Sequence, residues 1–398
     1  MPILFLTVLI DLIGFGMVIP ILPFMAPQFG ASAFDIAMLI AAYSVCAGLV
    51  GGWWGKLSDR LGRKPVIILC LLGTALSYAT LAFAKTLLAV YVARIMAGSF
   101  AGIYGVASAM VADLSKPEER AKSMGLIGSA FGLGMVGGPF IGGVLAGDEI
   151  NFLMPSLFAA SLSVMAAFLA LIKLPESHGR EKRQAHQVWR SETGKVSFIH
   201  LLKQTHNRWL IIEFLLHSMV VSTVTYLFPL WVGDKLQWGP TQVGIVFGIQ
   251  GLMMALLQAK LVGVLSRRFG ELNVLTAAIA LLTLGFSLAS VAEQQHWMIL
   301  SFFLCISGAS SCSPVMNSIL SKRTPLEYRG RMLGNASALG AWGRVAGPLL
   351  AGSLLTLSGF SLAWAAGILI GLVYISWPLH ERFSSVSQGA IKPLEYQD

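Results

Sequence analysis

The feature that most constrains this chain is a series of long apolar runs that follow one another from end to end. A helix needs about 20 apolar residues to cross the hydrocarbon core of a bilayer. Only helices satisfy their own backbone hydrogen bonds over such runs in lipid. We therefore predict an all-α polytopic membrane protein with twelve transmembrane helices, over residues 3–28, 35–54, 66–84, 87–112, 122–146, 152–173, 209–232, 241–265, 272–292, 297–320, 332–357 and 360–379.

The composition agrees with a membrane protein and argues against a soluble one. Hydrophobic residues make up 56% of the 398 residues and charged residues only 12%. That charged share is about half of the share usual in soluble domains. A soluble chain of this length would show polar faces at helical spacing, and most of these runs show none.

The distribution of Lys and Arg predicts the orientation. Most of the 28 Lys and Arg residues fall in alternate connecting segments, and the longest of these is 173–208. The other set of loops holds only Lys85 and Lys235. By the positive-inside rule, both termini are expected on the cytoplasmic side. The net charge of +9 then mostly reflects this bias, and no nucleic-acid partner is expected.

The first apolar run and the four cysteines bear on signal cleavage and on disulfide or metal chemistry. The first run carries Asp11 and has no basic stretch before it, so we read it as a retained span and not as a cleaved signal. The four cysteines all lie inside predicted spans, which favours packing roles over disulfides. No metal site is expected.

The second half of the chain repeats the first at an offset of about 208 residues. Gly55, Ser58 and Gly62 correspond to Gly263, Ser266 and Gly270, and Gly138-Pro139 corresponds to Gly347-Pro348. Six helices per half make the repeats parallel in topology, and such folds place a substrate site between the halves. The predicted organisation is a six-helix bundle over 1–173, a cytoplasmic linker over 174–207, a second six-helix bundle over 208–382 and a cytoplasmic tail over 383–398.

Four motifs resemble a known family. The stretch GKLSDRLGRK (55–64) looks like the signature of the major facilitator superfamily, and RIMAGSFAG (94–102) resembles its fourth-helix motif. The stretch GLGMVGGPFIGG (132–143) looks like the antiporter motif, and DLIGFGMVIPILP (11–23) is similar to the first helix of the drug:proton antiporters, particularly the tetracycline-efflux branch. The resemblance implies the major facilitator fold and alternating access.

The charged decapeptide is predicted to form a cytoplasmic gate. Two glycines would permit a tight turn and close helix approach. Asp59 would face the start of the eleventh helix near Met332, whose free N–H groups favour an anion. Arg60 or Arg63 would pair with Asp113, and this latch would hold the outward-open state. The alternative is a solvated loop that only obeys the positive-inside rule. The predicted gate residues are Gly55, Asp59, Arg60, Gly62, Arg63 and Asp113.

Charged residues inside the predicted spans are the candidates for proton coupling, because such charges are costly in lipid. Asp11 and Arg94 would meet if the first and fourth helices are adjacent. Asp11 would then carry a proton, or the two would form a static pair. Glu213 and His217 lie four residues apart on one helix face, which suits proton coupling. Alternatively, Glu213 pairs with Arg208 near the membrane surface.

Arg344 is a further charge within a span, and two roles are open for it. It would either neutralise an acidic partner, with Glu213 as one candidate, or bind an anionic group on the substrate. Aromatic side chains are candidates for an apolar cavity, although each also suits packing or the interfacial belt. The predicted cavity set is Tyr43, Phe131, Tyr226, Trp342 and Arg344.

Glycines around a proline in the fifth span are predicted to let helices approach closely. In the antiporters this motif resembles a periplasmic seal. Its members here are Gly134, Gly138, Pro139, Gly142 and Gly143. One departure from the tetracycline exporters is Ser77, which stands where they have an intramembrane Asp. That departure puts the divalent-metal chemistry of tetracycline export in doubt.

These observations together predict a secondary active transporter that exports small amphipathic compounds in exchange for protons. The sequence contains no Walker motif for nucleotide binding, so ATP is not expected to drive transport. The proton gradient would supply the energy, and no cofactor is expected. The alternatives are a carrier of one metabolite or siderophore-like anion, and a non-transporting membrane sensor. No catalytic constellation favours an enzyme. We expect a monomer in the bacterial inner membrane, with a small molecule, protons and the lipid bilayer as its partners.

Overall fold

The computed structural model describes residues 2–115, 120–147, 150–177, 207–324 and 329–387, and within these ranges every regular element is a helix. Ten helices among them are long and apolar enough to cross a membrane. One of these, α15, contains two predicted spans, and the shorter apolar helix α11 supplies another. The predicted all-α polytopic fold with twelve spans is therefore confirmed.

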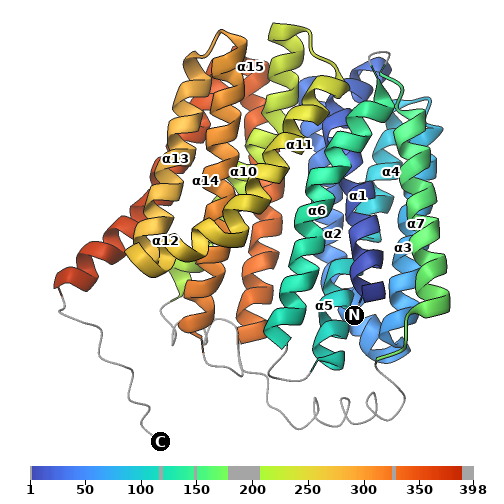
Figure 1. Ribbon diagram of the computed structural model, residues 1–398. Coiled ribbons are helices and arrows are strands. Elements are labelled where there is room, and N and C mark those ends of the chain that lie inside the picture. The colour runs from blue at the N-terminus through green and yellow to red at the C-terminus, as the bar shows by residue number, and fades with distance from the viewer. Residues whose placement is uncertain (1, 116–119, 148–149, 178–206, 325–328, 388–398) are drawn as a thin grey trace, which may run out of the picture.

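The first half of the chain forms one bundle, shown from blue to green in Figure 1. Within it, α1 packs mainly against α6 and α7, while α4 packs against α2 and α3. Its helices are α1 (Pro2–Met25) with the short η1 (Ala26–Phe29), α2 (Ala33–Leu61), α3 (Arg63–Ala82), α4 (Leu87–Ser99), α5 (Ile103–Leu114), α6 (Arg120–Ala146) and α7 (Leu153–Lys173).

The second half forms the neighbouring bundle, shown from yellow-green to red. Here α10 packs mainly against α15, and α13 packs against α14 and α15. Its elements are α10 (Arg208–Leu236), α11 (Pro240–Leu256), the π-helical turn η2 (Leu257–Leu261), α12 (Val262–Phe269), α13 (Glu271–Val291), α14 (Gln295–Lys322) and α15 (Arg329–Ser387). The pairs α1–α6 and α10–α15 occupy equivalent places in the two repeats.

The fourth predicted span is broken into α4 and α5 by a tryptophan from α2. The Nε1 of Trp54 donates a hydrogen bond of 2.7 Å to the carbonyl oxygen of Ser99, the last residue of α4. An added Cβ at Gly102 would lie 2.5 Å from the Trp54 ring, so only glycine leaves room for it there. The side chain thus ends one helix and positions the next.

The charged decapeptide is helical over most of its length, contrary to the predicted turn. Helix α2 continues to Leu61, and Gly62 alone reverses the chain, with φ 109° and ψ 161°. A positive φ of this size favours glycine. Gly55 lies inside α2, and a Cβ there would meet no atom within 4 Å. The prediction that Gly55 serves a turn is therefore wrong, and in this conformation Gly55 makes no close helix approach.

Helix α15 joins the eleventh and twelfth predicted spans through one non-helical residue, Gly359, whose φ of 76° and ψ of −169° break the helix. The second part of α15 runs on to Ser387, beyond the predicted end of the bundle at 382. Most of the predicted linker 174–207 and the tail after 387 lie outside the described residues. The proposed domain boundaries stay predictions.

The two bundles meet at the end where α2 begins and α6 finishes, which we call the far end. There α6 packs against α11, and α2 packs against α15. A Cβ on Gly143 would lie 2.9 Å from Gly244 Cα, and a Cβ on Gly352 would lie 2.8 Å from Ala37 Cβ. Small residues of this kind let membrane helices approach closely.

Toward the opposite end, which we call the Gly62 end, the same helix faces lose contact. On α2, a Cβ added at Gly48 would lie 3.6 Å from the Cβ of Ala341 on α15. A Cβ added at Gly52 or Gly55, one and two turns further along α2, would meet no atom within 4 Å. On α6, Val136 packs on Gly251 of α11, yet Gly132, one turn nearer the Gly62 end, meets nothing. Among the described residues, the bundles are therefore closed at the far end and separate toward the Gly62 end, which leaves a cleft between them.

Candidate transport site

Tyr43 on α2 lies at the centre of a charged cluster at mid-depth. The guanidinium carbon of Arg94 on α4 stands 4.7 Å from the centroid of the Tyr43 ring. The ring of Phe15 on α1 lies 5.2 Å from the same ring, tilted by 33°. Tyr43 is also within electrostatic range of Asp11 and Arg344, so charged groups of both halves act on it. A cation over a ring face is stabilised by the ring quadrupole.

Asp11 is one turn from Phe15 on the same face of α1, and its side chain is half-buried. Its Oδ1 is shielded from solvent and has no hydrogen-bond partner among the described residues. The expected ion pair with Arg94 does not form in the described chain. The reason lies in the packing, because α4 contacts mainly α2 and α3 and therefore brings Arg94 to Tyr43.

The buried acid of the second half is Glu213 on α10, which is 3% exposed. Its Oε2 has no hydrogen-bond partner within the described ranges. The expected alternative pairing with Arg208 does not form among these residues, since the Arg208 guanidinium lies 5.7 Å from the Trp209 ring. His217, one turn on, contacts the hydroxyl of Tyr374 through Nδ1 at 3.3 Å.

Arg344 on α15 lies on the flank between α10 and α2. Gly343 packs on the α10 backbone and Ala341 on Gly48 of α2, and helical geometry places Arg344 between these two directions. Its side chain is exposed. Trp342, which is 53% exposed, stands about 200° away around the helix and therefore lies on another face of α15 than Arg344.

Arg63 is the centre of the predicted gate, and it is 6% exposed. Its Nη1 lies 2.7 Å from Asp59 Oδ1, and its Nε donates to Asp113 Oδ2 at 3.0 Å. The backbone N–H of Arg63 donates to Glu176 Oε1 at 2.9 Å, beyond α7. The expected pairing with Asp113 is thus made by Arg63, while Arg60 is exposed on the helix surface.

This gate network lies entirely within the first half in the described structure. The prediction that Asp59 faces the start of α15 near Met332 does not hold in this conformation. Met332 is fully buried in the core of the second half, and the two bundles are apart at this end. Asp59 instead binds Arg63, one turn along the chain.

The glycines of the antiporter motif divide between two partners. Gly134, Gly138 and Gly142 face the backbone of α1, where an added Cβ would lie 2.5–2.6 Å from atoms of Leu12, Ile13 and Met17. Gly143 faces α11 across the halves, and the carbonyl of Pro139 packs on Gly244. The motif therefore both holds α6 against α1 and joins the two bundles at the far end.

Two other residues of the predicted cavity set are Tyr226 and Phe131. Tyr226 is fully buried, and its hydroxyl donates a 2.6 Å hydrogen bond to the carbonyl oxygen of Ala33 on α2. It therefore ties the halves together at the far end and does not line the open cleft. The side chain of Phe131 lies outside the described part of the structure.

Sequence reasoning missed several side chains that complete these clusters. Tyr78 of α3 packs on Gly14 and lies within electrostatic range of Asp11 and Arg94. Glu176 supports Arg63 from more than a hundred positions away, and no local pattern signals that contact. Phe15 could have been found, because it stands four residues after Asp11 and thus on the same helix face.

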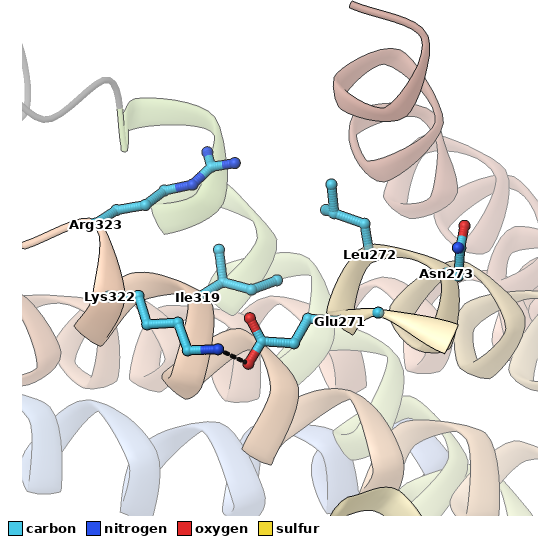
Figure 2. A pocket seen from close by; sticks show the side chains of 7 residues that line it. Glu271, Leu272, Asn273, Ile319, Lys322 and Arg323 are labelled. Carbon is cyan, nitrogen blue, oxygen red and sulfur yellow. Dashed lines mark hydrogen bonds and ion pairs between the residues drawn. The ribbon is translucent and has the colours of Figure 1, made fainter. Parts of the chain in front are cut away.

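Two surface hollows lie away from the charged cluster. One of about 590 Å³ lies at the far end and is lined by Phe24, Trp238 and Gln242 among others. The other, of about 320 Å³, lies where α13 begins and α14 ends, and Figure 2 shows Glu271 paired with Lys322 there. Within the described ranges no group of three or more His, Cys, Asp or Glu side chains could hold a metal ion.

Comparisons with known proteins agree with these observations. The Major Facilitator Superfamily profile matches residues 4–333 and 231–392. The chain is similar to the class C tetracycline resistance protein of Escherichia coli, with 31% identity over 373 residues that cover 92% of this chain and 93% of that protein. It also resembles the crystal structure of the human organic anion transporter MFSD10 (TETRAN), with a TM-score of 0.72, 25% identity and coverage of 95% of this chain and 98% of that one.

One solved structure shares only the fold. A bacterial homologue of the human lysosomal transporter Spinster, in an inward-facing and occupied conformation, matches with a TM-score of 0.79 at 11% identity. It covers 98% of each chain, so the whole arrangement of helices is shared.

Proposed function

Because this chain belongs to the major facilitator superfamily, we propose that it is a proton-coupled antiporter that exports small amphipathic compounds by alternating access. The similarity to tetracycline resistance proteins over nearly the whole chain supports drug export. Ser77, whose hydroxyl donates to the Thr74 carbonyl oxygen, supplies no acid at the third-helix place, so this position gives no support to a metal chelate as the substrate. The protein is a multi-pass membrane protein, and we place it in the bacterial inner membrane.

The observation that carries the proposal is Asp11, a half-buried carboxyl group without a partner beside a cleft between the halves. A carboxylate inside a membrane costs several kcal/mol unless it is paired or takes up a proton. Because Asp11 is not paired with Arg94 here, proton uptake from the open end removes that cost. Substrate bound near Tyr43 would favour release of the proton.

The orientation that the Lys and Arg distribution predicts makes the Gly62 end cytoplasmic. The described conformation is then open to the cytoplasm and closed toward the periplasm. We further propose that the halves close at the Gly62 end in the other state, where Asp59 would reach the start of α15 and complete the latch. The monomer, both cytoplasmic termini and the roles of Glu213 and His217 belong to the same proposal.

The test is uphill transport into inverted membrane vesicles whose interior is acidified. We expect accumulation of a fluorescent amphipathic compound that collapses when the pH gradient is dissipated. Asp11→Asn should abolish uphill accumulation and leave folded protein in the membrane, because an amide cannot exchange a proton. Asp234→Asn, at an exposed carboxylate in a pair with Lys235, is the matched control and should transport normally.

A second measurement separates coupling from folding. Purified wild-type protein in weakly buffered detergent should release protons when the substrate is added, and Asp11→Asn should release none. Retained uphill transport by Asp11→Asn would refute the role of this carboxyl group.

A further inference from the structure

Arg344 is the charge in the cleft that the proposed coupling scheme does not use. It lies on α15 between the faces that pack on α10 and on α2, and its side chain is exposed. It is also within electrostatic range of Tyr43 on the opposite bundle. The guanidinium group therefore faces the space between the halves, at the depth of the charged cluster.

The described residues provide no counter-charge for Arg344. No carboxylate in them forms an ion pair with it, and Glu213, the acid expected to neutralise it, has an oxygen without any partner. Asp11 also stands without a partner. Arg94 is held by the ring face of Tyr43 and not by an acid. Two guanidinium groups, the buried Arg94 and the exposed Arg344, thus act on Tyr43 together with a single acid of the first half, Asp11.

An excess of positive charge at this depth is costly unless an anion offsets it. Guanidinium groups bind carboxylate, phosphate and sulfonate groups through paired hydrogen bonds, and they stack on aromatic rings. The ring pair of Phe15 and Tyr43 stands beside the same space and offers an apolar, aromatic wall. The site therefore combines a cation that lacks a partner with a surface suited to a flat ring.

From this arrangement we infer that the exported compounds are amphipathic anions, whose negative group binds Arg344 while an aromatic ring packs on Phe15 and Tyr43. The inference rests on the proposed function and adds the charge of the substrate. It makes Arg344 a specificity-determining residue that touches the substrate, and it assigns no proton transfer to that residue.

The test compares three probes that share one fluorescent ring system and differ in charge. These are dansylate, which is anionic, dansylamide, which is neutral, and dansylcadaverine, which is cationic. Binding to purified full-length protein is measured by fluorescence, and transport is measured in inverted vesicles with an acidic interior. The variants are Arg344→Gln, Arg344→Lys and, as a control, Arg267→Gln, which removes an exposed positive charge on α12.

We expect wild-type protein to bind dansylate more tightly than the other two probes. Arg344→Gln should weaken dansylate binding by about 10-fold or more, since a charge-assisted hydrogen bond is lost. Binding of dansylamide should change less than about 2-fold on the same scale. Arg344→Lys should recover part of the dansylate affinity, and Arg267→Gln should leave it unchanged.

Two outcomes would overturn the inference. One is an unchanged dansylate affinity in Arg344→Gln, and the other is an equal loss for dansylate and dansylamide, which would indicate a packing role. The transport arm keeps the two proposals apart. If no probe accumulates with the pH gradient, the export function fails, whereas proton-driven accumulation of dansylamide or dansylcadaverine without dansylate removes only the anion specificity.

Discussion

The two halves of this chain make the same turn with opposite charges. Gly62 and Gly270 both reverse the chain at positive φ, 109° and 85°, and the N–H of each bonds to a serine carbonyl oxygen one turn back. In the first half the next residue is Arg63, which binds Asp113. In the second half the next residue is Glu271, which binds Lys322 at the equivalent position.

The two ion pairs differ in the burial of their cation as well as in the order of their charges. The Arg63 side chain is 7% exposed and has two carboxylates and the Ser58 hydroxyl as partners. Lys322 is 68% exposed and lies at the edge of the hollow in Figure 2. Exposed ion pairs contribute about 0–1 kcal/mol, whereas removal of one partner from a buried pair costs about 3–5 kcal/mol. Duplication thus preserved the turn, while the cation of the pair beside it is buried in the first half and exposed in the second.

The largest expected effect is that of Arg63→Met. It leaves Asp59 and Asp113 without their shared cation, so we expect the free energy of unfolding to fall by about 3–5 kcal/mol and transport to be lost. Lys322→Met is the matched change in the second half and should cost about 1 kcal/mol or less. Thermal unfolding in detergent, together with vesicle transport, measures both. Equal losses in the two variants would break the comparison.

Swapping the two charges within each ion pair is a sharper test of the comparison between the halves. The double variant Arg63→Glu with Asp113→Lys gives the first half the charges of the second, but Asp59 and Glu176 would then repel the new carboxylate. We expect it to be no more stable than Arg63→Met. The reverse exchange, Glu271→Arg with Lys322→Glu, should stay within about 1 kcal/mol of wild type. Rescue of the first half by the exchange would show that only pairing matters there.

A smaller effect is expected where the halves touch. Gly143→Leu places a side chain against the backbone of α11, and overpacking of this kind costs about 1–3 kcal/mol. Gly137→Ala, on the same helix, meets open space and should stabilise by about 0.5–1 kcal/mol, since alanine favours helices over glycine. The unfolding temperatures of the two variants measure both effects. If both variants were destabilised, the effect of Gly143→Leu could not be assigned to the contact between α6 and α11.

The smallest expected effect is the change that salt makes in the coupling energy of the exposed ion pair. Double-mutant cycles should give a coupling of about 1 kcal/mol or less for Glu271 with Lys322, falling toward zero at about 1 M salt because exposed charges are screened. The coupling of Arg63 with Asp113 should persist, because buried charges are screened much less. A coupling for Glu271 with Lys322 that survives high salt would contradict the exposed geometry.

Much of the fold could be predicted from local pattern. Apolar length indicated the spans, and the offset of about 208 residues indicated the two bundles. The breaks were harder to predict. The interruption at Phe100–Gly102 depends on Trp54 from another helix, and α2 continues as a helix through Gly55 to Leu61 although glycine disfavours helix.

The candidate site shows the same division. The intramembrane charges Asp11, Arg94, Glu213 and Arg344 were evident in the sequence, because charges are rare in such spans. Their partners were not. Arg94 lies over the ring of Tyr43 and does not pair with Asp11, and the Tyr226 hydroxyl donates a hydrogen bond to the Ala33 carbonyl oxygen across the halves. The packing of α4 and α10 decides which residues these side chains contact.

The sequence by itself determined that this chain spans a membrane as two related bundles with a few costly charges inside. The reason is that transfer of apolar runs into lipid, and the penalty for charge there, depend on residue type alone. Only the tertiary structure decided which end of the cleft is open, which acids lack partners and which arginine faces the cleft. Those properties arise from contacts between helices far apart in the chain, and no local pattern encodes them.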